Sequence, residues 1–175
     1  YRDYVAMAPI RENTASAMLL LSDFGYNQEF CDPFCGSGTI VTEGARQALN
    51  IAPGVLREFD YNFWSKFDKN AYKLAYQEAK DNERLDKKIN FHGSDIDPKA
   101  IKLAERHAFN AGLADKISFE VKDVANFMPT SINGTIVTNP PYGDRLMTAS
   151  EVSSLYKTLG KIYTKLDNWS LFVIT

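Results

Sequence analysis

The chain has 175 residues, a length that suits a single domain with a sizeable hydrophobic core. Its content of 45% hydrophobic and 24% charged residues is typical of a globular protein. A formal net charge of −2 excludes a uniformly basic surface, so any nucleic-acid binding is expected to be local or supplied by another domain. No apolar run is long enough to span a membrane and no signal peptide opens the chain, which predicts a cytoplasmic protein.

Apolar periodicity predicts regular elements along most of the chain. In order, we expect a helix over residues 12–24, a strand over 29–31, a helix over 39–49, a strand over 89–94, a helix over 98–111, strands over 117–121 and 132–138, a helix over 151–166 and a strand over 169–174. Strands that alternate with helices predict an α/β, Rossmann-like fold, with a mostly parallel twisted sheet and helices on both faces. The chain begins at Tyr1 and ends in the fifth expected strand, so we expect a fragment of a longer polypeptide, truncated after that strand.

The region from Asn50 to Lys88 interrupts this alternation. It contains a group of aromatic residues around Trp64 and a charged helix expected over 71–84. Because the charges are mixed, we interpret it as a solvated helix over a small aromatic core. It is predicted to be an insertion within one catalytic domain that spans residues 1–175.

The two cysteines, Cys31 and Cys35, lie close together, and the only histidines are His92 and His107. These are too few and too scattered for a zinc site, so no metal is expected. The thiols are interpreted as small apolar residues beside a tight turn.

The segment DPFCGSGT, residues 32–39, follows the first expected strand. Gly36 and Gly38 lack a Cβ, so the backbone can turn sharply and a ligand can approach it closely. The next helix offers free N–H groups to a carboxylate or phosphate, and Asp32 can attract a positive amine. No lysine precedes the Ser/Thr, which excludes a nucleotide-hydrolase loop and leaves a nucleoside-bearing cofactor or a plain strand-to-helix turn.

Two later strands also end in acidic residues. Asp95 directly follows the second strand and is positioned to bind ribose hydroxyls, with Ile96 beside it, while Asp97 is expected to cap the next helix. A nicotinamide enzyme would place this acid about 20 residues after the glycines, and here the gap is far longer. Asp123 follows the third strand and could accept the adenine amino group beside Val124, although a solvated loop aspartate is the alternative.

The segment NPPY, residues 139–142, follows the buried fourth strand, at the edge where ligands bind in such sheets. The Asn139 side-chain carbonyl and the Pro140 backbone carbonyl can both accept hydrogen bonds from one amino group. The prolines stiffen the turn and Tyr142 can stack on a base. Together with the glycine turn, this pattern predicts methyl transfer to an amino nitrogen.

The predicted site divides into two sets. The candidate catalytic residues are Asn139, Pro140, Pro141 and Tyr142. The candidate cofactor-binding residues are Asp32, Phe34, Gly36, Gly38, Thr39, Asp95, Ile96, Asp123, Val124 and Asn139.

These motifs resemble the S-adenosylmethionine-dependent RNA guanine-N2 methyltransferases, and most closely the bacterial 23S ribosomal RNA enzymes that carry an RNA-binding THUMP domain upstream. The resemblance rests on DPFCGSGT, on NPPYGDR (139–145), on APIREN (8–13) and on the aromatic stretch near Trp64. It implies S-adenosyl-L-methionine as cofactor, S-adenosyl-L-homocysteine as product, ribosomal RNA as partner and a seven-stranded sheet. It also implies that the segment 8–13 lies over the methionine end of the cofactor.

The predicted function is methyl transfer to guanine N2 in RNA, with the target base flipped out of its helix. DNA adenine-N6 and protein glutamine-N5 methyltransferases share the NPPY element, and both remain alternatives. A nicotinamide oxidoreductase and a non-catalytic RNA-binding module are more distant ones. The role of Arg145, as a phosphate contact or in a surface salt bridge, and the oligomeric state are left open.

Overall fold

The computed structural model describes residues 10–22, 24–142 and 148–175, which divide into two compact units. The second unit is Arg46–Lys88, and the first comprises the residues before and after it. The helices of the first unit are α1 (Glu12–Ser22), α2 (Thr39–Ala48, which runs into the second unit), α4 (Pro98–Asn110) and α5 (Ala149–Tyr163). Its strands are β1 (Glu29–Asp32), β2 (Asn90–Asp95), β3 (Ile117–Val121), β4 (Gly134–Thr138) and β5 (Trp169–Val173). No helix in the described ranges is both long and apolar enough to cross a membrane.

The five strands form one parallel sheet in the order β3-β2-β1-β4-β5. The central strand β1 pairs with β2 on one side and with β4 on the other. The chain therefore builds the sheet outward in two directions from β1, and the carboxyl ends of β1 and β4 flank the point where the direction changes. The prediction of a Rossmann-like α/β fold with a parallel sheet is confirmed.

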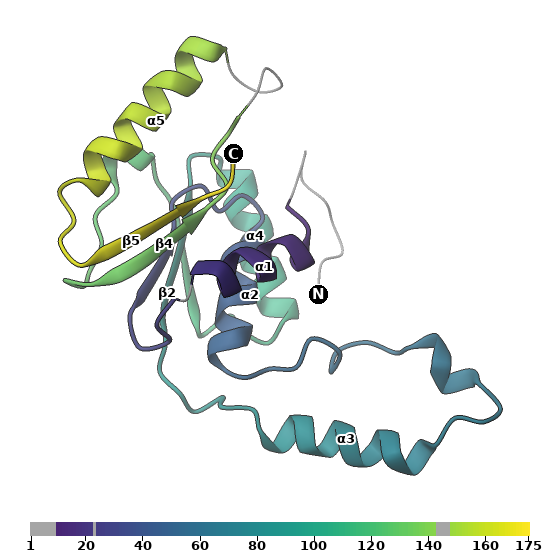
Figure 1. The fold of residues 1–175 in the computed structure, drawn as a ribbon. Helices are drawn as coiled ribbons and strands as arrows, with labels where there is room; N and C mark the ends of the chain where they lie inside the picture. The colour runs from purple at the N-terminus through teal and green to yellow at the C-terminus, as the bar shows by residue number, and fades with distance from the viewer. Residues whose placement is uncertain (1–9, 23, 143–147) are drawn as a thin grey trace. The chain divides into compact units, whose positions relative to one another are not determined.

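Helices cover both faces of this sheet, with α1, α2 and α4 on one face and α5 on the other (Figure 1). On the first face Phe30 stacks on Phe91 with ring centroids 4.9 Å apart, and Phe24 meets both rings edge-on. On the second face Ile136 and Trp169 form a smaller cluster. Burial of these apolar side chains supplies the main driving force for the fold.

Two element boundaries differ from the sequence prediction for a clear physical reason. Strand β4 begins at Gly134, not at Ile132, whose side chain is 86% exposed. The backbone N–H of Ser131 donates to the buried carboxylate of Glu29, so this stretch closes a turn and does not join the sheet. Helix α5 begins before Glu151 because Thr148 and Glu151 form a capping box.

The second unit contains a 3₁₀ turn η1 (Asp60–Phe63) and helix α3 (Lys69–Asp81). The helix lies two to three residues earlier than predicted, because the Asp68 carboxylate accepts from the backbone N–H groups of Asn70 and Ala71 and fixes its start. The two ends of the unit are joined where the Arg84 N–H donates to the Leu49 carbonyl at 2.8 Å.

Gly134 is expected to tolerate no side chain. A Cβ at this position would overlap the Trp169 ring and lie 2.5 Å from the Glu29 carbonyl oxygen, which belongs to the backbone and cannot move aside. We expect Gly134→Ala to lower the free energy of unfolding by about 2 kcal/mol or more, measured by urea denaturation.

Gly160 in α5 provides the matched control, because a Cβ there meets nothing within 4 Å. Gly160→Ala is expected to raise the free energy of unfolding by about 0.5–1 kcal/mol, since alanine favours a helix interior. Equal effects of the two substitutions would contradict the packing described at Gly134.

Candidate active site

The carboxyl ends of three neighbouring strands carry the polar groups of the site. Asp32 ends β1, Asp95 ends β2 and Thr138 ends β4, and parallel strands bring these ends to one edge of the sheet. The Thr138 hydroxyl donates to Asp32 Oδ1 at 2.6 Å. The same oxygen accepts from the backbone N–H of Phe34 at 3.1 Å. Asp32 therefore links β4 to the first residues of the glycine turn.

The glycine turn, residues 33–38, is held against β2. The Gly36 N–H donates to Asp95 Oδ2 and the Cys35 N–H donates to the Ser94 carbonyl, both at 2.9 Å. Gly36 and Gly38 have φ angles of 52° and 77°, in the left-handed region that favours glycine. A Cβ on Gly36 would meet nothing within 4 Å, so this side of the turn is open to a ligand.

The far side of the turn is braced by a buried histidine that the sequence analysis did not select. His107 Nδ1 lies 3.0 Å from the Ser37 carbonyl oxygen. A carbonyl only accepts, so Nδ1 must carry the proton. His107 lies one turn after the buried Ala104 on α4, and this position on an apolar helix face was the available signal.

The Asp32 carboxyl is only 1% exposed, and burial raises its pKa to about 7. The hydrogen bonds from Thr138 and Phe34 act in the opposite direction, because they stabilise the ionised form. Asp32 is therefore partly ionised near neutral pH. A cation bound nearby would draw it fully into the ionised form.

The acidic residues after β2 have separate roles. Asp95 Oδ1 accepts from the Asp97 N–H, while Asp97 accepts from the Lys99 N–H and caps α4, as predicted. The side chain of Ile96 is exposed beside Asp95. This arrangement fixes a carboxylate against the glycine turn and leaves an exposed apolar side chain at the following residue.

The residues after β3 have a simpler environment. Asp123 is exposed and accepts from the Ala125 N–H at 2.8 Å, which fixes the turn η2 (Val124–Asn126). Val124 is buried. The Lys122 N–H donates to the Asp95 carbonyl, so this loop is joined to the end of β2.

Asn139 follows Thr138 at the end of β4. Its Oδ1 is buried and has no hydrogen-bond partner among the residues that the structure describes. A buried carbonyl without a donor is costly unless a ligand supplies one. Pro140, the next residue, is buried, whereas Tyr142 is 52% exposed. The NPPY turn thus offers an acceptor for an N–H donor and an exposed aromatic residue three positions later.

Tyr156 on α5 is a second residue that the sequence analysis did not select. Its hydroxyl is buried and finds no hydrogen-bond partner within the described ranges. Its pKa is raised by burial and, to a smaller extent, by Tyr142. Tyr156 therefore lies close to the NPPY turn, although nothing in the spacing of the sequence connects the two.

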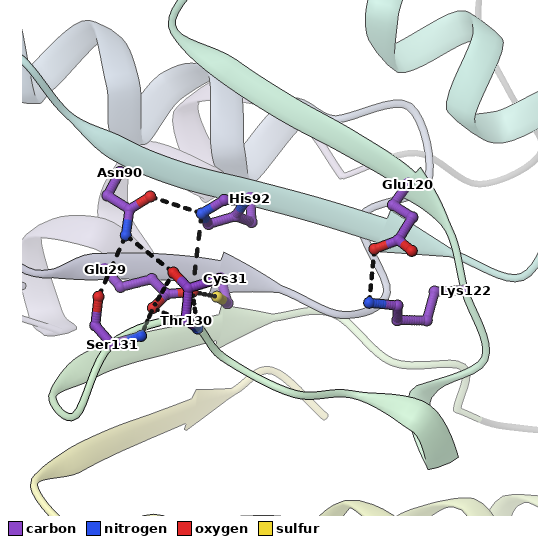
Figure 2. A network of polar contacts seen from close by, with 8 residues as sticks. All are labelled: Glu29, Cys31, Asn90, His92, Glu120, Lys122, Thr130 and Ser131. Atoms are coloured by element: carbon purple, nitrogen blue, oxygen red, sulfur yellow. Dashed lines mark hydrogen bonds and ion pairs between the residues drawn. The ribbon is translucent and has the colours of Figure 1, made fainter.

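A separate polar network lies on the opposite face of the sheet from α2 and α4 (Figure 2). Glu29 accepts from the backbone N–H groups of Thr130 and Ser131 and from the Thr130 hydroxyl, and His92 and Cys31 lie beside it. Burial acts to raise the pKa of Glu29, but these hydrogen bonds outweigh it and the pKa is lowered. Burial also raises the pKa of Cys31 well above its usual value, which makes it a poor nucleophile.

The cavity next to this network measures about 130 Å³. Sites for ligands of nucleoside size have volumes of roughly 300–1,000 Å³, so this cavity is too small for the predicted cofactor. The described residues include no group of three or more His, Cys, Asp or Glu arranged to hold a metal. We therefore assign the network a structural role, which is to close the β3–β4 connection onto β1.

The structure brings most of the predicted site residues to one edge of the sheet. Thr39 begins α2 directly after the glycine turn, and Phe34 is half-buried within that turn. The structure does not describe the GDR segment (residues 143–145), which includes Arg145, or the first two residues of APIREN (residues 8 and 9). Ile10 and Arg11 precede α1.

A parallel sheet with its switch point beside β1, a braced glycine turn and an open amide acceptor after β4 define a Rossmann-like methyltransferase domain. The whole chain, residues 1–175, matches the family UPF0020 (RMKL-like, methyltransferase domain). The chain belongs to this family, and the prediction of a methyltransferase is confirmed.

Individual relatives agree with this assignment. The chain is 39% identical to the ribosomal RNA large subunit methyltransferase K/L of Shewanella frigidimarina, over 99% of this chain and 25% of that protein. SMU.472, described as a candidate methyltransferase and solved with S-adenosylhomocysteine, superimposes with a TM-score of 0.93 at 35% identity. A Listeria monocytogenes protein, whose name predicts an N6-adenine-specific DNA methylase, gives 0.92 at 41% identity. The two alignments cover 98% of this chain and 46% and 45% of the solved chains, so the chain spans less than half of each.

The raised pKa of Asp32 gives stability a specific pH dependence. Between about pH 4 and 7 the unfolded chain has lost the Asp32 proton and the folded protein retains it. The contribution of Asp32 to the free energy of unfolding must then fall as pH rises, by up to about 1.4 kcal/mol per pH unit.

We expect the stability of the wild type relative to Asp32→Asn to decline between pH 5 and 7 and to level off above pH 7, in urea titrations at each pH. The matched control is Asp115→Asn, which changes an exposed carboxyl. A difference between the wild type and Asp32→Asn that stays constant across this range would refute the raised pKa.

Proposed function

We propose that this chain is the catalytic domain of an S-adenosylmethionine-dependent methyltransferase whose acceptor is the exocyclic N2 amine of guanine in 23S ribosomal RNA. The observation that carries the proposal is the buried, unpartnered Oδ1 of Asn139 at the edge of the sheet. Family membership supplies the reaction class. A ribosomal RNA acceptor would place the enzyme in the cytoplasm.

The methyl donor is S-adenosyl-L-methionine, and the site fits its chemistry. The open side of Gly36 admits a ligand, Asp32 can attract its amino group, and Asp95 can accept from its ribose hydroxyls. Ile96 offers an exposed apolar surface for the adenine ring, and Asp123 offers an acceptor for its amino group. Val124, the other predicted neighbour of the ring, is 4% exposed and has little side-chain surface to add. When bound, the cofactor supplies a methyl group activated by a sulfonium. S-adenosyl-L-homocysteine is the product.

The residues of this chain act mainly by positioning the acceptor amine. Two carbonyl oxygens, Asn139 Oδ1 and that of Pro140, accept one hydrogen bond each from the NH₂ group, which aims the nitrogen lone pair at the methyl donor. Tyr142, half-exposed at the rim, stacks on the base. No strong base is needed, because the amine loses its proton during or after attack. The buried setting of Asn139 strengthens both orientation and electrostatic stabilisation.

Three acceptors are compatible with the proposed grip, and guanine N2 is the one we favour. Guanine N2 is supported by the pairing of DPFCGSGT with NPPY. An RNA acceptor is supported by the Shewanella relative, whose name specifies large-subunit ribosomal RNA. Adenine N6 in DNA would use the same grip, and the name of the Listeria protein favours it. Glutamine N5 in a protein is the third possibility. We further propose that residues 50–88 are an insertion in this domain and that an RNA-binding domain precedes it in the full-length protein.

Removal of the Asn139 side chain tests the proposed mechanism. In the full-length protein, Asn139→Ala should reduce the rate of methyl transfer to ribosomal RNA by about 100-fold or more, because one acceptor that orients the amine is lost. The matched control is Asn126→Ala, which truncates an exposed asparagine and should leave the rate unchanged.

The rate is followed with labelled S-adenosylmethionine, and the methylated nucleoside is identified by mass spectrometry. Label in N2-methylguanosine supports the proposed acceptor, while label in N6-methyladenine of DNA would replace it. A correctly folded Asn139→Ala variant with near-normal transfer would rule out the role given to Asn139.

A second pair of variants separates cofactor binding from helix capping. Asp95→Ala removes the carboxylate that holds Gly36 and that is proposed to bind the ribose. Affinity for S-adenosylhomocysteine should fall by about tenfold or more, because a hydrogen bond to a charged group contributes about 1.5–3 kcal/mol. Asp97→Ala removes only the cap of α4. It should cost about 1 kcal/mol of stability and leave the affinity nearly unchanged.

Titration calorimetry gives the affinity, and urea denaturation gives the stability. Equal losses of affinity in the two variants would show that Asp95 has no special role toward the cofactor.

A further inference from the structure

The unit Arg46–Lys88 has no role in the chemistry proposed above, yet it carries an unusual surface. Helix α3 buries none of its residues. Five rings form a continuous series of contacts, with successive centroids 5.0, 5.2, 5.6 and 6.2 Å apart: Phe59, Tyr61, Phe67, Tyr72 and Tyr76. This series stiffens the unit from within, because each ring packs on the next.

Two further aromatic residues lie outside that series. Phe63 is 80% exposed and Trp64 is 69% exposed. Within the described residues, the aromatic contact of Trp64 is an edge contact with Tyr61, with ring centroids 6.5 Å apart. Large aromatic surfaces left in water on a stiff support usually mark a binding site. Their flat faces would suit a planar partner.

Positive charges accompany these rings. The unit contains nine Lys and Arg against seven Asp and Glu, whereas the full chain has 20 against 22. Lys66, Lys69 and Lys73 form no ion pair with any other residue in the described part of the chain. Lys69 and Lys73 are three residues before Tyr72 and Tyr76, and this helical spacing makes each lysine the neighbour of a ring.

We propose that Arg46–Lys88 is a binding arm for single-stranded RNA. Bases stack on Trp64 and Phe63, while Lys66, Lys69 and Lys73 contact phosphates. A platform of aromatic rings interleaved with cations is what single-stranded nucleic acid recognises, because every base has a flat π-face and every linkage is anionic. The inference rests on the proposed RNA acceptor and adds to it a second point of contact.

A protein partner is the competing occupant, since Leu56 and Leu74 are also exposed on this unit. The charges favour RNA. Three lysines with no ionic partner in the described part of the chain, on the same unit as the exposed rings, would be costly to bury against a neutral protein surface, but they match a polyanion.

The first test uses the full-length protein and a fluorescent single-stranded RNA oligonucleotide of mixed sequence, followed by anisotropy at fixed salt. The double variant Phe63→Ala/Trp64→Ala should bind about tenfold more weakly or worse, because stacking contributes roughly 1–3 kcal/mol per base. Phe109→Ala is the matched control, since Phe109 is 73% exposed on α4 in the other unit. Its affinity should equal that of the wild type.

The second test does not depend on the aromatic residues. The triple variant Lys66→Gln/Lys69→Gln/Lys73→Gln should reduce the slope of log K against log salt by about 2, because each phosphate contact on a single strand contributes about 0.7. Lys157→Gln/Lys161→Gln/Lys165→Gln removes the same charge from the region of α5 and should leave the slope unchanged. Thermal unfolding and binding of S-adenosylhomocysteine confirm that each variant is folded.

The outcomes are distinct. Weaker RNA binding in both arm variants, with unchanged affinity for S-adenosylhomocysteine, supports the arm. Wild-type affinity for RNA in both arm variants overturns the proposal. If sedimentation then shows that these variants have a changed oligomeric state, the surface is a protein contact instead. Failure of the wild type itself to bind RNA would instead count against the proposed RNA acceptor.

Discussion

The hydrogen bond from Thr138 to the buried carboxyl of Asp32 is the contact on which the site depends. It joins the ends of β1 and β4, the two strands between which the sheet changes direction. The same carboxyl holds the start of the glycine turn through Phe34. Because Asn139 directly follows Thr138, this one contact sets the relative position of the proposed cofactor turn and the acceptor grip. A buried acid with a raised pKa is a cost to stability, and it is tolerated here where positioning matters.

Much of this architecture could be predicted from the sequence because it depends on local signals. The order of strands and helices followed from apolar periodicity, and the glycine turn and the Asp97 cap followed from residue types with narrow conformational roles. The errors were confined to the boundaries of elements. Ser131 binds Glu29, which lies 102 residues earlier, and so β4 starts two residues late. The α5 capping box at Thr148 was available in the sequence and was overlooked.

The parts of the site that could not be predicted depend on long-range pairing. Thr138 and Asp32 are 106 residues apart, and His107 and Ser37 are 70 apart. Periodicity can indicate that such a polar residue lies on a buried face, but only the fold shows which backbone or carboxyl group it meets. The same holds for Tyr156, whose nearness to Tyr142 depends on how α5 packs after β4. Sequence motifs therefore identified the groups that are proposed to face the ligand, while the groups that hold them in place were seen only in the structure.

The proposed determinants of function are divided between the two units. The proposed grip of Asn139 and Pro140 would recognise an amino group and would say little about the molecule that carries it. Relatives of this chain accordingly bear names that specify either RNA or DNA. Selectivity for the acceptor must then come from surfaces outside the grip. In this chain the exposed rings of Phe63 and Trp64, with the lysines at 66, 69 and 73, are proposed to be such a surface. They belong to Arg46–Lys88 and not to the strand ends of the proposed site. One mechanism can thus be combined with different acceptors, because the proposed grip and the proposed acceptor surface belong to separate parts of the fold.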